Sequence, residues 1–441
     1  MLASLLLLLT GPVLQGPVVH EIEIDGKPED RKTWLRSVSP TESYVHVSPP
    51  EEGKEALFYL DGEDLRPVVY EDGNKAEGEL SSFLGDVSVY FTLLYGRRRL
   101  IYRLEQGTAL LLRNTENKPL SVKDYEMVGR GPEFLQESYE TVVYRLDGST
   151  AHPVWIDKLE AEYPVLVPSP TELYLADTRG LYRKTPGRMW RITEQGAEPL
   201  LWPNGDPADF GLTKYYTVGR VTFALTNDYE MQRDPEAEVH MASLWQLAGR
   251  ELLPVFDGEG DLLQSYTLLI GAAAALEEAL YVRGLVSDSD DIHLWRVNEE
   301  GECSLVMSEG RLFGGMHLDV EQAGDRLLIE RHVSEDEDPE LWLGEGEAAV
   351  PIVTEEATPL LGKAQGVFRG DRGVIVHKGD GGRRLFYVDE THVAHRLEHD
   401  SLASRASSLS SIQVVPSRSG FYVNYPGDDG APRHVLHVRL P

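Results

Sequence analysis

Short apolar runs separated by polar turns recur along the whole chain. In His293–Glu302 an apolar run carries a large aromatic residue and is followed by a polar turn and a glycine. A second apolar run, Cys303–Met307, comes directly after it. Runs of this length bounded by Gly or Asp-Gly predict β-hairpins. The pattern therefore predicts a chain built from many short antiparallel strands.

The hairpins share an aromatic residue at a regular spacing. These anchors are Phe58, Tyr102, Tyr144, Trp190, Trp245, Trp295, Trp342 and Phe386. Neighbouring anchors are between 42 and 55 residues apart, and His434–Leu440 is a degenerate ninth copy. A repeat of about 40–50 residues is typical of one four-stranded propeller blade.

The residues around the anchors support this interpretation, because a strand buried on both faces reads as a continuous apolar run. Such runs precede the anchor at Val87–Tyr95 and Leu327–Ile329, and follow it at Leu110–Leu112, Leu252–Phe256 and Val350–Val353. We predict an all-β protein with a single β-propeller of about eight four-stranded blades. Nine copies can be counted, but rings usually have about four to eight blades, so we choose eight, with one unit split or displaced, and keep seven to nine open. A β-solenoid or a pair of β-sandwiches is the alternative.

The two ends of the chain bear on domain organisation. Met1–Gly16 is apolar but too short for a membrane-spanning helix, which needs about 20 residues, so it reads as a signal peptide. Residues 17–441 then form the propeller domain. The last unit, Ile412–Leu440, contains only three predicted strands. We expect Val18–Ile24 to supply its fourth strand and close the ring.

Four segments fit the repeat less well. Glu116–Ser138 predicts an insertion or short helix, and Gly271–Ala279 either a helical turn or an Ala-rich inner strand. Leu225–Met241 is an acidic lengthened hairpin, and Ser401–Ser411 a Ser-rich surface connection.

One unit resembles a known group of propellers. Gly324–Thr354 contains GDRLLIE, then ELWLGEG, then VPIVT. This order is similar to the WD-like repeats of TolB-type propellers, a family that includes binding, scaffolding and peptidase-gating proteins. The Ser-Pro-Asp-Gly turn usual in that family is missing from nearly every unit. The resemblance therefore implies the fold and transfers no functional residue.

The charge of the chain limits its possible partners, and its cysteine content limits disulfide formation. The chain has 42 Lys plus Arg against 73 Asp plus Glu, a formal net charge of −31. Phosphates of nucleic acid and anionic membrane surfaces would be repelled. A cationic partner, divalent ions or simple solubility remain open. Cys303 is the only cysteine, so no internal disulfide is possible, and we expect it to be a small buried apolar residue.

Metal-binding patterns are weak. Acidic turns occur at Asp257–Asp261, Ser287–Asp291, Ser334–Asp338 and Asp428-Asp429, but none has the spacing of a calcium-binding loop. We expect solvated hairpin tips there. The densest histidines are His392, His395 and His399, and the first two should point to opposite faces of an outer strand. No metal site is predicted.

Catalytic motifs give no assignment either. The sequence has no G-x-S-x-G elbow, Walker A motif, G-x-G-x-x-G before a helix, or C-x-x-C. No catalytic residue and no cofactor is predicted. Five tyrosines suggest either a stacking surface for sugars or peptides or ordinary packing, which we favour: Tyr215, Tyr216, Tyr229, Tyr422 and Tyr425.

Two functions follow from these patterns. The first is an exported, non-enzymatic propeller, periplasmic or extracellular and monomeric. It would bind a protein, peptide or glycan through one face, with no nucleic acid partner and no membrane span. The second is a hydrolase or lyase with a carboxylate or divalent-ion site at the central channel. Convergent acids with shifted pKa values near the axis would favour the enzyme.

Overall fold

The structure is a computed structural model of the 441-residue chain. It describes residues 17–22, 32–39, 42–48, 54–84, 88–95, 98–122, 125–128, 133–137, 142–155, 164–169, 172–177, 188–193, 196–208, 211–227, 241–258, 260–266, 273–286, 291–334, 336–379, 382–398, 413–426 and 433–440. The predicted signal peptide, residues 1–16, lies outside these ranges.

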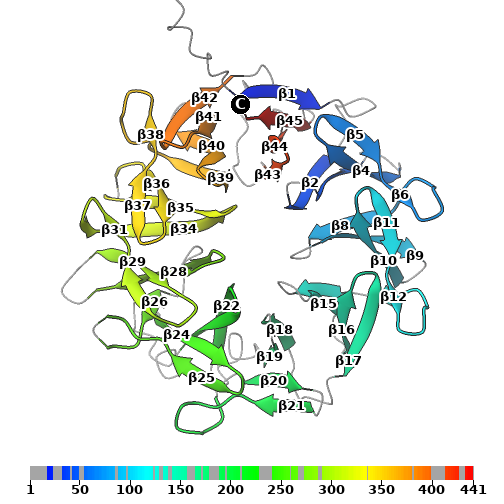
Figure 1. Ribbon diagram of the computed structural model, residues 1–441, viewed down its shortest axis with the longest axis horizontal. Helices are drawn as coiled ribbons and strands as arrows, with labels where there is room; N and C mark the ends of the chain where they lie inside the picture. Colours follow the sequence, from blue (N-terminus) through cyan, green and yellow to red (C-terminus); the bar gives the residue numbers. More distant parts are fainter. Residues whose placement is uncertain are drawn as a thin grey trace, which may run out of the picture.

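Nine small sheets form a ring around a central axis (Figure 1). No helix occurs among the described residues. Each sheet is one blade of four main antiparallel strands, numbered here in chain order. Blade 1 contains β2 (Lys32–Ser39), β3 (Glu42–Ser48), β4 (Glu55–Asp61) and β5 (Asp64–Pro67). Blade 2 contains β8 (Leu80–Leu84), β9 (Val89–Tyr95), β10 (Arg98–Glu105) and β11 (Thr108–Leu111). Blade 3 contains β14 (Tyr125–Val128), β15 (Glu133–Glu137), β16 (Val142–Asp147) and β17 (Thr150–Trp155).

The next three blades repeat this order. Blade 4 contains β18 (Pro164–Pro168), β19 (Leu173–Asp177), β20 (Met189–Thr193) and β21 (Gly196–Pro199). Blade 5 contains β22 (Gly211–Val218), β23 (Val221–Asn227), β24 (Met241–Ala248) and β25 (Glu251–Pro254). Blade 6 contains β27 (Ala273–Ala275), β28 (Leu280–Leu285), β29 (Ile292–Val297) and β30 (Cys303–Leu305).

The last three blades bring the chain back to its start. Blade 7 contains β34 (His317–Ala323), β35 (Arg326–His332), β36 (Glu340–Glu345) and β37 (Ala348–Pro351). Blade 8 contains β39 (Lys363–Arg369), β40 (Arg372–Gly379), β41 (Gly382–Val388) and β42 (Val393–Leu397). Blade 9 contains β43 (Gln413–Ser417), β44 (Gly420–Pro426), β45 (Arg433–Arg439) and the N-terminal strand β1 (Val18–Ile22). The first strand of a blade lies nearest the axis, as β22, β34 and β39 do in Figure 1.

Very short strands add to the blades. They are β6 (Val69–Tyr70), β7 (Glu77–Gly78), β12 (Arg113–Asn114), β13 (Ser121–Val122), β26 (Gln264–Tyr266), β31 (Met307–Ser308), β32 (Arg311–Leu312), β33 (Gly314–Gly315) and β38 (Val353–Thr354). Four of them, β6, β12, β31 and β38, follow the fourth strand of one blade and pair in parallel with the fourth strand of the next. These bridges join neighbouring blades at the outer side of the ring.

The predicted repeat is confirmed. Every aromatic anchor lies on the third strand of its blade, from Phe58 on β4 to Phe386 on β41. The degenerate ninth copy forms β45, so it is a true blade. The ring therefore has nine blades. Our first choice of eight, which followed the usual size of such rings, was one too few, but nine lies within the predicted range.

Closure of the ring also follows the prediction. β1 pairs with β45 in antiparallel register, from Val18 opposite Arg439 to Ile22 opposite Val435. β1 thus supplies the fourth strand of blade 9, and the chain ends meet within one sheet. Ile22 is 6% exposed and packs with Leu35 and Val45 of blade 1. A linear solenoid and two separate sandwiches are both excluded by this arrangement.

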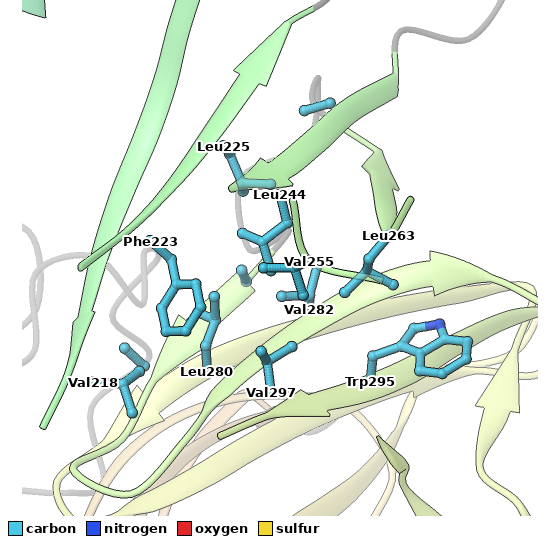
Figure 2. Packing of buried hydrophobic residues seen from close by; sticks show 13 residues of the cluster. Val218, Phe223, Leu225, Leu244, Val255, Leu263, Leu280, Val282, Trp295 and Val297 are labelled. Atoms are coloured by element: carbon cyan, nitrogen blue, oxygen red, sulfur yellow. The ribbon is translucent and has the colours of Figure 1, made fainter. Parts of the chain in front are cut away.

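The hydrophobic core consists of layers between neighbouring blades. In the layer of Figure 2, Phe223 and Leu244 of blade 5 pack against Leu280 and Trp295 of blade 6. All four of these side chains are at most 4% exposed. Because each blade presents one apolar face to either neighbour, its strands read as the continuous apolar runs seen in the sequence.

The ambiguous segments are partly resolved. Ala273–Ala275 forms β27, so the Ala-rich stretch is an inner strand. The described part of Glu116–Ser138 contains β13, β14 and β15 and no helix, so the short helix expected there is not found among these residues. Residues 228–240 of the acidic hairpin and the whole of Ser401–Ser411 lie outside the described residues.

Candidate active site

Polar side chains gather on one face of the inner hairpin of blade 7. β34 and β35 are antiparallel, with His317 opposite His332 and Asp319 opposite Glu330. Residues directly opposite each other on such strands have Cβ atoms about 4.5–5.5 Å apart on the same face. The register therefore brings two acids and two imidazoles together.

The other face of the hairpin holds it in place. Leu318, Val320, Leu327 and Ile329 are at most 3% exposed and belong to the apolar layer between blades 6 and 7. Since side chains alternate along a strand, burying these residues turns the polar set toward blade 8. The local fold thus follows from simple polar and apolar alternation in His317–Val320.

Three of the polar residues converge closely. One carboxylate oxygen each from Asp319 and Glu330, and one ring nitrogen of His332, all lie within 4.8 Å of one another. His317 Nε2 is 3.0 Å from Asp319 Oδ1, and the two imidazoles meet edge to face with their centroids 5.4 Å apart. We call Asp319, Glu330 and His332 the axial triad.

Neighbouring blades complete the surroundings of the triad. From blade 6, Arg283 Nη1 lies 3.3 Å from Asp319 Oδ1. From blade 8, the Ala364 N–H donates a 2.9 Å hydrogen bond to Glu330 Oε1. The side chain of Asp319 is 35% exposed, whereas that of Arg283 has no exposed surface. Residues of three blades therefore meet at this point.

The two carboxyl groups of the triad have opposite pKa shifts. Burial acts to raise the pKa of Asp319, but the hydrogen bond and charge of His317, with the charges of Arg283 and His332, hold it below its usual range. Burial raises the pKa of Glu330, although the Ala364 N–H opposes the rise. Two carboxyl groups with pKa values displaced in opposite directions can act as a base and an acid at the same pH.

His332 is suited to a third role. Burial lowers its pKa, so the neutral imidazole is favoured. Its Nε2 is buried and has no hydrogen-bond partner among the described residues. Neutral imidazole and ionised carboxylate are the ligand forms that divalent metals require. The triad could thus hold a divalent cation through three protein ligands.

Sequence reasoning did not single out this group. The segment Leu327–Ile329 was assigned correctly to the second strand of a blade, but the adjacent Glu330 and His332 gave no motif. The alternation of His317, Leu318, Asp319 and Val320 was the available signal, since it predicts one polar face on an inner strand.

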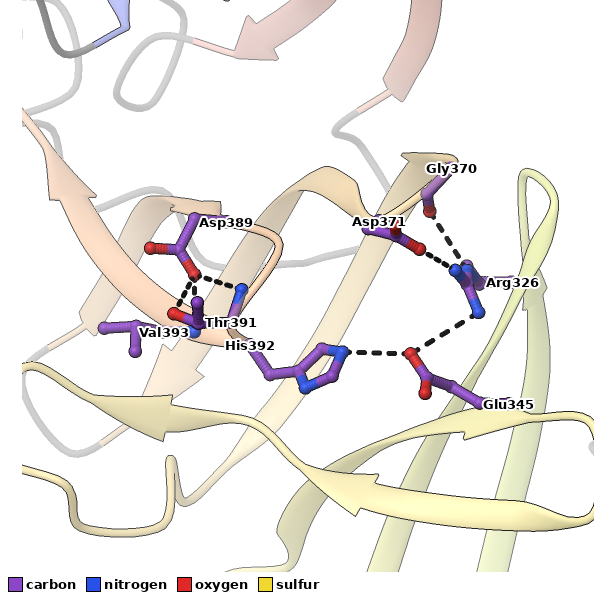
Figure 3. A network of polar contacts seen from close by, with 8 residues as sticks. All are labelled: Arg326, Glu345, Gly370, Asp371, Asp389, Thr391, His392 and Val393. Carbon is purple, nitrogen blue, oxygen red and sulfur yellow. Dashed lines mark hydrogen bonds and ion pairs between the residues drawn. The ribbon is translucent and has the colours of Figure 1, made fainter. Parts of the chain in front are cut away.

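The histidines that the sequence did single out lie on the outer side of blade 8. His392 precedes β42 and its Nε2 is 2.9 Å from Glu345 Oε1, next to Arg326 (Figure 3). His395 lies between Glu355 at 2.9 Å and Asp389 at 2.8 Å. The two imidazoles therefore contact different carboxylates, and His399 lies outside the described residues.

The Asp389 turn in the same figure is held by its own side chain. Asp389 Oδ1 accepts hydrogen bonds from the backbone N–H groups of Thr391 and Val393, at 2.8 and 3.0 Å. Burial acts to raise the pKa of Asp389, but these bonds and those from the His395 and Thr391 side chains lower it to about 2. This network stabilises an outer turn.

The remaining candidates behave as structural residues. In the acidic turn Asp257–Asp261, the Asp261 N–H donates to Asp257 Oδ1 at 3.0 Å. Residues 287–290 and 335, and Asp428-Asp429, lie outside the described residues. Cys303 is half-buried, and burial raises the pKa of its thiol to about 12.

The tyrosines do not form an exposed surface where they are described. Tyr422 is 1% exposed and its hydroxyl donates to Gly62 O at 2.7 Å. Tyr215 and Tyr216 are half-buried and pack against the layers between blades. Tyr229 and the side chain of Tyr425 lie outside the described part of the chain. The rings of Tyr215, Tyr216 and Tyr422 therefore pack between blades, as the packing interpretation expects.

Comparisons with known proteins give matches at the level of structure. No protein-family model matches the sequence, and no curated protein matches it. A puromycin-hydrolysing peptidase of Mycobacterium tuberculosis is 12% identical with a TM-score of 0.35, over 93% of this chain and 58% of that one. A prolyl endopeptidase is 10% identical with a TM-score of 0.35, over 93% and 53%. The acylaminoacyl peptidase of Pyrococcus horikoshii is 10% identical with a TM-score of 0.33, over 81% and 52%.

The chain thus spans between 52% and 58% of the length of these structures. All three are peptidases. They differ in class from our first interpretation, a non-enzymatic binding propeller, which we do not retain. Separately, the described residues include no helix with the length and apolar character needed to cross a bilayer.

Proposed function

We propose that this chain is a hydrolase or lyase whose active site is the axial triad of Asp319, Glu330 and His332. The observation that carries the proposal is the convergence of their ligand atoms within 4.8 Å on strands beside the axis of the ring. Titratable groups that have shifted pKa values and lie close together are typical of active sites.

The two carboxyl groups would divide the proton transfers. Glu330 keeps its proton to a higher pH than an ordinary glutamate, so it can donate a proton to a leaving group. Asp319 stays ionised and can accept a proton from water or from substrate, or stabilise developing positive charge. His317 fixes the Asp319 carboxylate by its 3.0 Å contact.

A divalent cation is the second way in which the triad could act. Catalytic metal sites commonly have three protein ligands and one open position for water. When bound there, the ion would act as a Lewis acid and lower the pKa of its water to about 7. Asp319 and Glu330 would offer oxygen ligands and His332 its unpartnered Nε2. Glu330 would have to lose its proton to bind, so affinity should rise with pH.

The experiment measures hydrolysis and metal binding with the full chain. Chelator-treated protein is assayed on chromogenic peptide, ester and glycoside substrates, alone and with Zn²⁺, Mn²⁺, Mg²⁺ or Ca²⁺. We expect Asp319→Asn, Glu330→Gln and His332→Gln each to lower kcat by about 10²–10⁴-fold, the usual contribution of a positioned acid or base. Glu337→Gln is the matched control, because Glu337 is an exposed acid of the same blade.

The outcomes separate the two modes of action. Activity that survives chelation but is lost in Glu330→Gln indicates acid–base catalysis without metal. Activity restored by one metal, with calorimetric binding that all three triad variants lose, indicates a metal site. Variants as active as the Glu337→Gln control would refute the proposal, as would an absence of turnover on every substrate with every metal.

A further inference from the structure

Arg283 is a buried cation with donors left over. It lies on β28, and its side chain has no exposed surface. Nη1 donates to the carbonyl oxygen of Leu318 at the free inner edge of β34, and it is 3.4 Å from His317 Nε2. Nε and Nη2 are buried and have no hydrogen-bond partner among the described residues. One edge of the guanidinium is therefore used and the other is not.

The burial of the Arg283 charge lowers the free energy of unfolding. An arginine side chain stays protonated in proteins, so the charge is buried with it. Its only carboxylate neighbour at ion-pair distance among the described residues is Asp319. Burying a charge carries a large desolvation penalty, and replacing a whole buried ion pair by apolar residues of similar volume is often neutral or stabilising. Buried N–H groups without acceptors add to the cost. A function that uses the free edge would explain why the residue is present.

The free edge has a specific shape. The N–H of Nε and one N–H of Nη2 point in the same direction and form the side-on fork of the guanidinium. That fork matches the two oxygens of a carboxylate and binds it through two parallel hydrogen bonds.

Tyr216, on the innermost strand of blade 5, supplies another donor. Its hydroxyl is buried and has no partner among the described residues. Burial raises the pKa of Tyr216 to about 12, so the group remains a neutral phenol, and the charge of nearby Arg283 opposes the rise. Arg283 and Tyr216 thus present three unused donors from two blades.

The surrounding charges favour a singly charged ligand. The Asp319 carboxylate lies beside the same guanidinium, and the whole chain has a formal net charge of −31. A dianion such as phosphate would be repelled more strongly than a carboxylate. Two apolar side chains, Met316 and Val333, are 49% exposed and lie next to the His317–His332 pair at the open end of the hairpin, Met316 before His317 and Val333 after His332. An apolar group next to the carboxylate would find a surface there.

We propose that Arg283 and Tyr216 bind the carboxylate of a ligand that carries an apolar group beside it. This binding is independent of turnover, and only the statement that the ligand is the substrate rests on the proposed function. Because Arg283 has no exposed surface, neighbouring side chains must move aside when the carboxylate enters.

The test uses a pair of probes that differ only in charge. N-acetyl-leucine has a carboxylate and N-acetyl-leucinamide has a neutral amide in its place. We expect the acid to raise the Tm of the full chain and the amide to leave it unchanged, since a ligand that binds only the folded state stabilises it. Inorganic phosphate is the third probe, and we expect no response to it.

Variants connect the response to Arg283. Arg283→Met should abolish the response to the acid, and the Tm of the free protein should fall, because Asp319 loses its cation and Leu318 O loses its donor. Arg283→Lys keeps the charge but lacks the fork, so affinity should fall by at least about tenfold. Tyr216→Phe should weaken binding by about tenfold or more, the effect of one hydrogen bond to a charged carboxylate. Arg331→Met is the control: its guanidinium has acceptors in Gly314 and Glu340, so the Tm should fall and the response persist.

Several results would overturn the inference. These are an equal response to acid and amide, a response to phosphate instead of the acid, and no response to any probe. A lower Tm in Arg283→Met with an unchanged response to the acid would make Arg283 a structural residue. If no substrate is turned over but the acid still raises the Tm through Arg283, the carboxylate site stands and only the proposed enzyme fails.

Discussion

Closure of the ring depends on a buried amide between the first and last blades. Asn424 on β44 has no exposed surface. Its Nδ2 donates to Thr33 O at 2.9 Å and to Gln413 Oε1 at 3.0 Å, and its Oδ1 accepts from Thr33 Oγ1 at 3.1 Å. Thr33 lies on β2, 391 residues earlier in the chain. Asn424→Ala therefore removes three hydrogen bonds, two of which join the two ends of the ring.

The expected loss in the free energy of unfolding follows from the burial of the groups that Asn424 contacts. Removing a partner from a buried polar group costs about 1–3 kcal/mol. The carbonyl and hydroxyl of Thr33 lose a partner in a fully buried setting, whereas Gln413 Oε1 is half-buried and still accepts from the Leu35 N–H at 2.9 Å. Counting the two buried losses gives about 2–6 kcal/mol. That is a large fraction of the stability of an ordinary domain.

Urea unfolding followed by tryptophan fluorescence measures this loss. The matched control is Asn298→Ala, because Asn298 makes two side-chain hydrogen bonds within an exposed hairpin turn, to the N–H and the carboxylate of Glu302. Water replaces those bonds, so we expect a loss below about 1 kcal/mol for the control. Equal unfolding midpoints for the two variants would show that the Asn424 contacts do not stabilise the closed ring.

Two further predictions concern closure and the triad. Deleting residues 17–25 removes β1 with its ladder to β45 and the buried Ile22, so calorimetry should show a lower Tm for the whole ring; an unchanged melt would contradict the role of β1. Because burial raises the pKa of Glu330, the folded chain holds this proton to higher pH than the unfolded chain, and ionisation costs stability as pH rises above about 4.3. Glu330→Gln should therefore match wild type in Tm below about pH 4 and exceed it above about pH 7. A difference that does not change with pH would count against the shift.

The ring could be predicted because the residues that indicate each blade lie close together in the sequence. The aromatic anchor and its flanking apolar runs recur about every 45 residues, and this repeat can be read from a single sequence. The blade count was harder, since β45 has no aromatic anchor and β1 lies at the other end of the chain. Pairing between Ile22 and Val435 is a contact of distant residues that only the incomplete last unit suggested.

The triad could not be predicted in the same way, because it depends on register and on three separate blades. Asp319 and Glu330 become neighbours only through the pairing of β34 with β35. Arg283 occurs in the apolar run Leu280–Leu285, where nothing in the sequence distinguishes a buried arginine from an exposed one. Many acids elsewhere in the chain give the same local pattern at hairpin tips, so composition could not select these two.

The blade architecture explains why chemistry can be concentrated on β34. Leu318 and Val320 satisfy the packing of this strand against blade 6, so its other positions are free of that constraint. The polar residues there are held by a rigid sheet, which suits groups that must keep fixed distances. Arg283 is different, because it places a buried charge with two unpartnered donor atoms beside this strand, and burying a charge carries a desolvation penalty. A propeller used only as a scaffold would gain nothing from those two donors. The functional argument therefore rests on Arg283 as much as on the triad beside it.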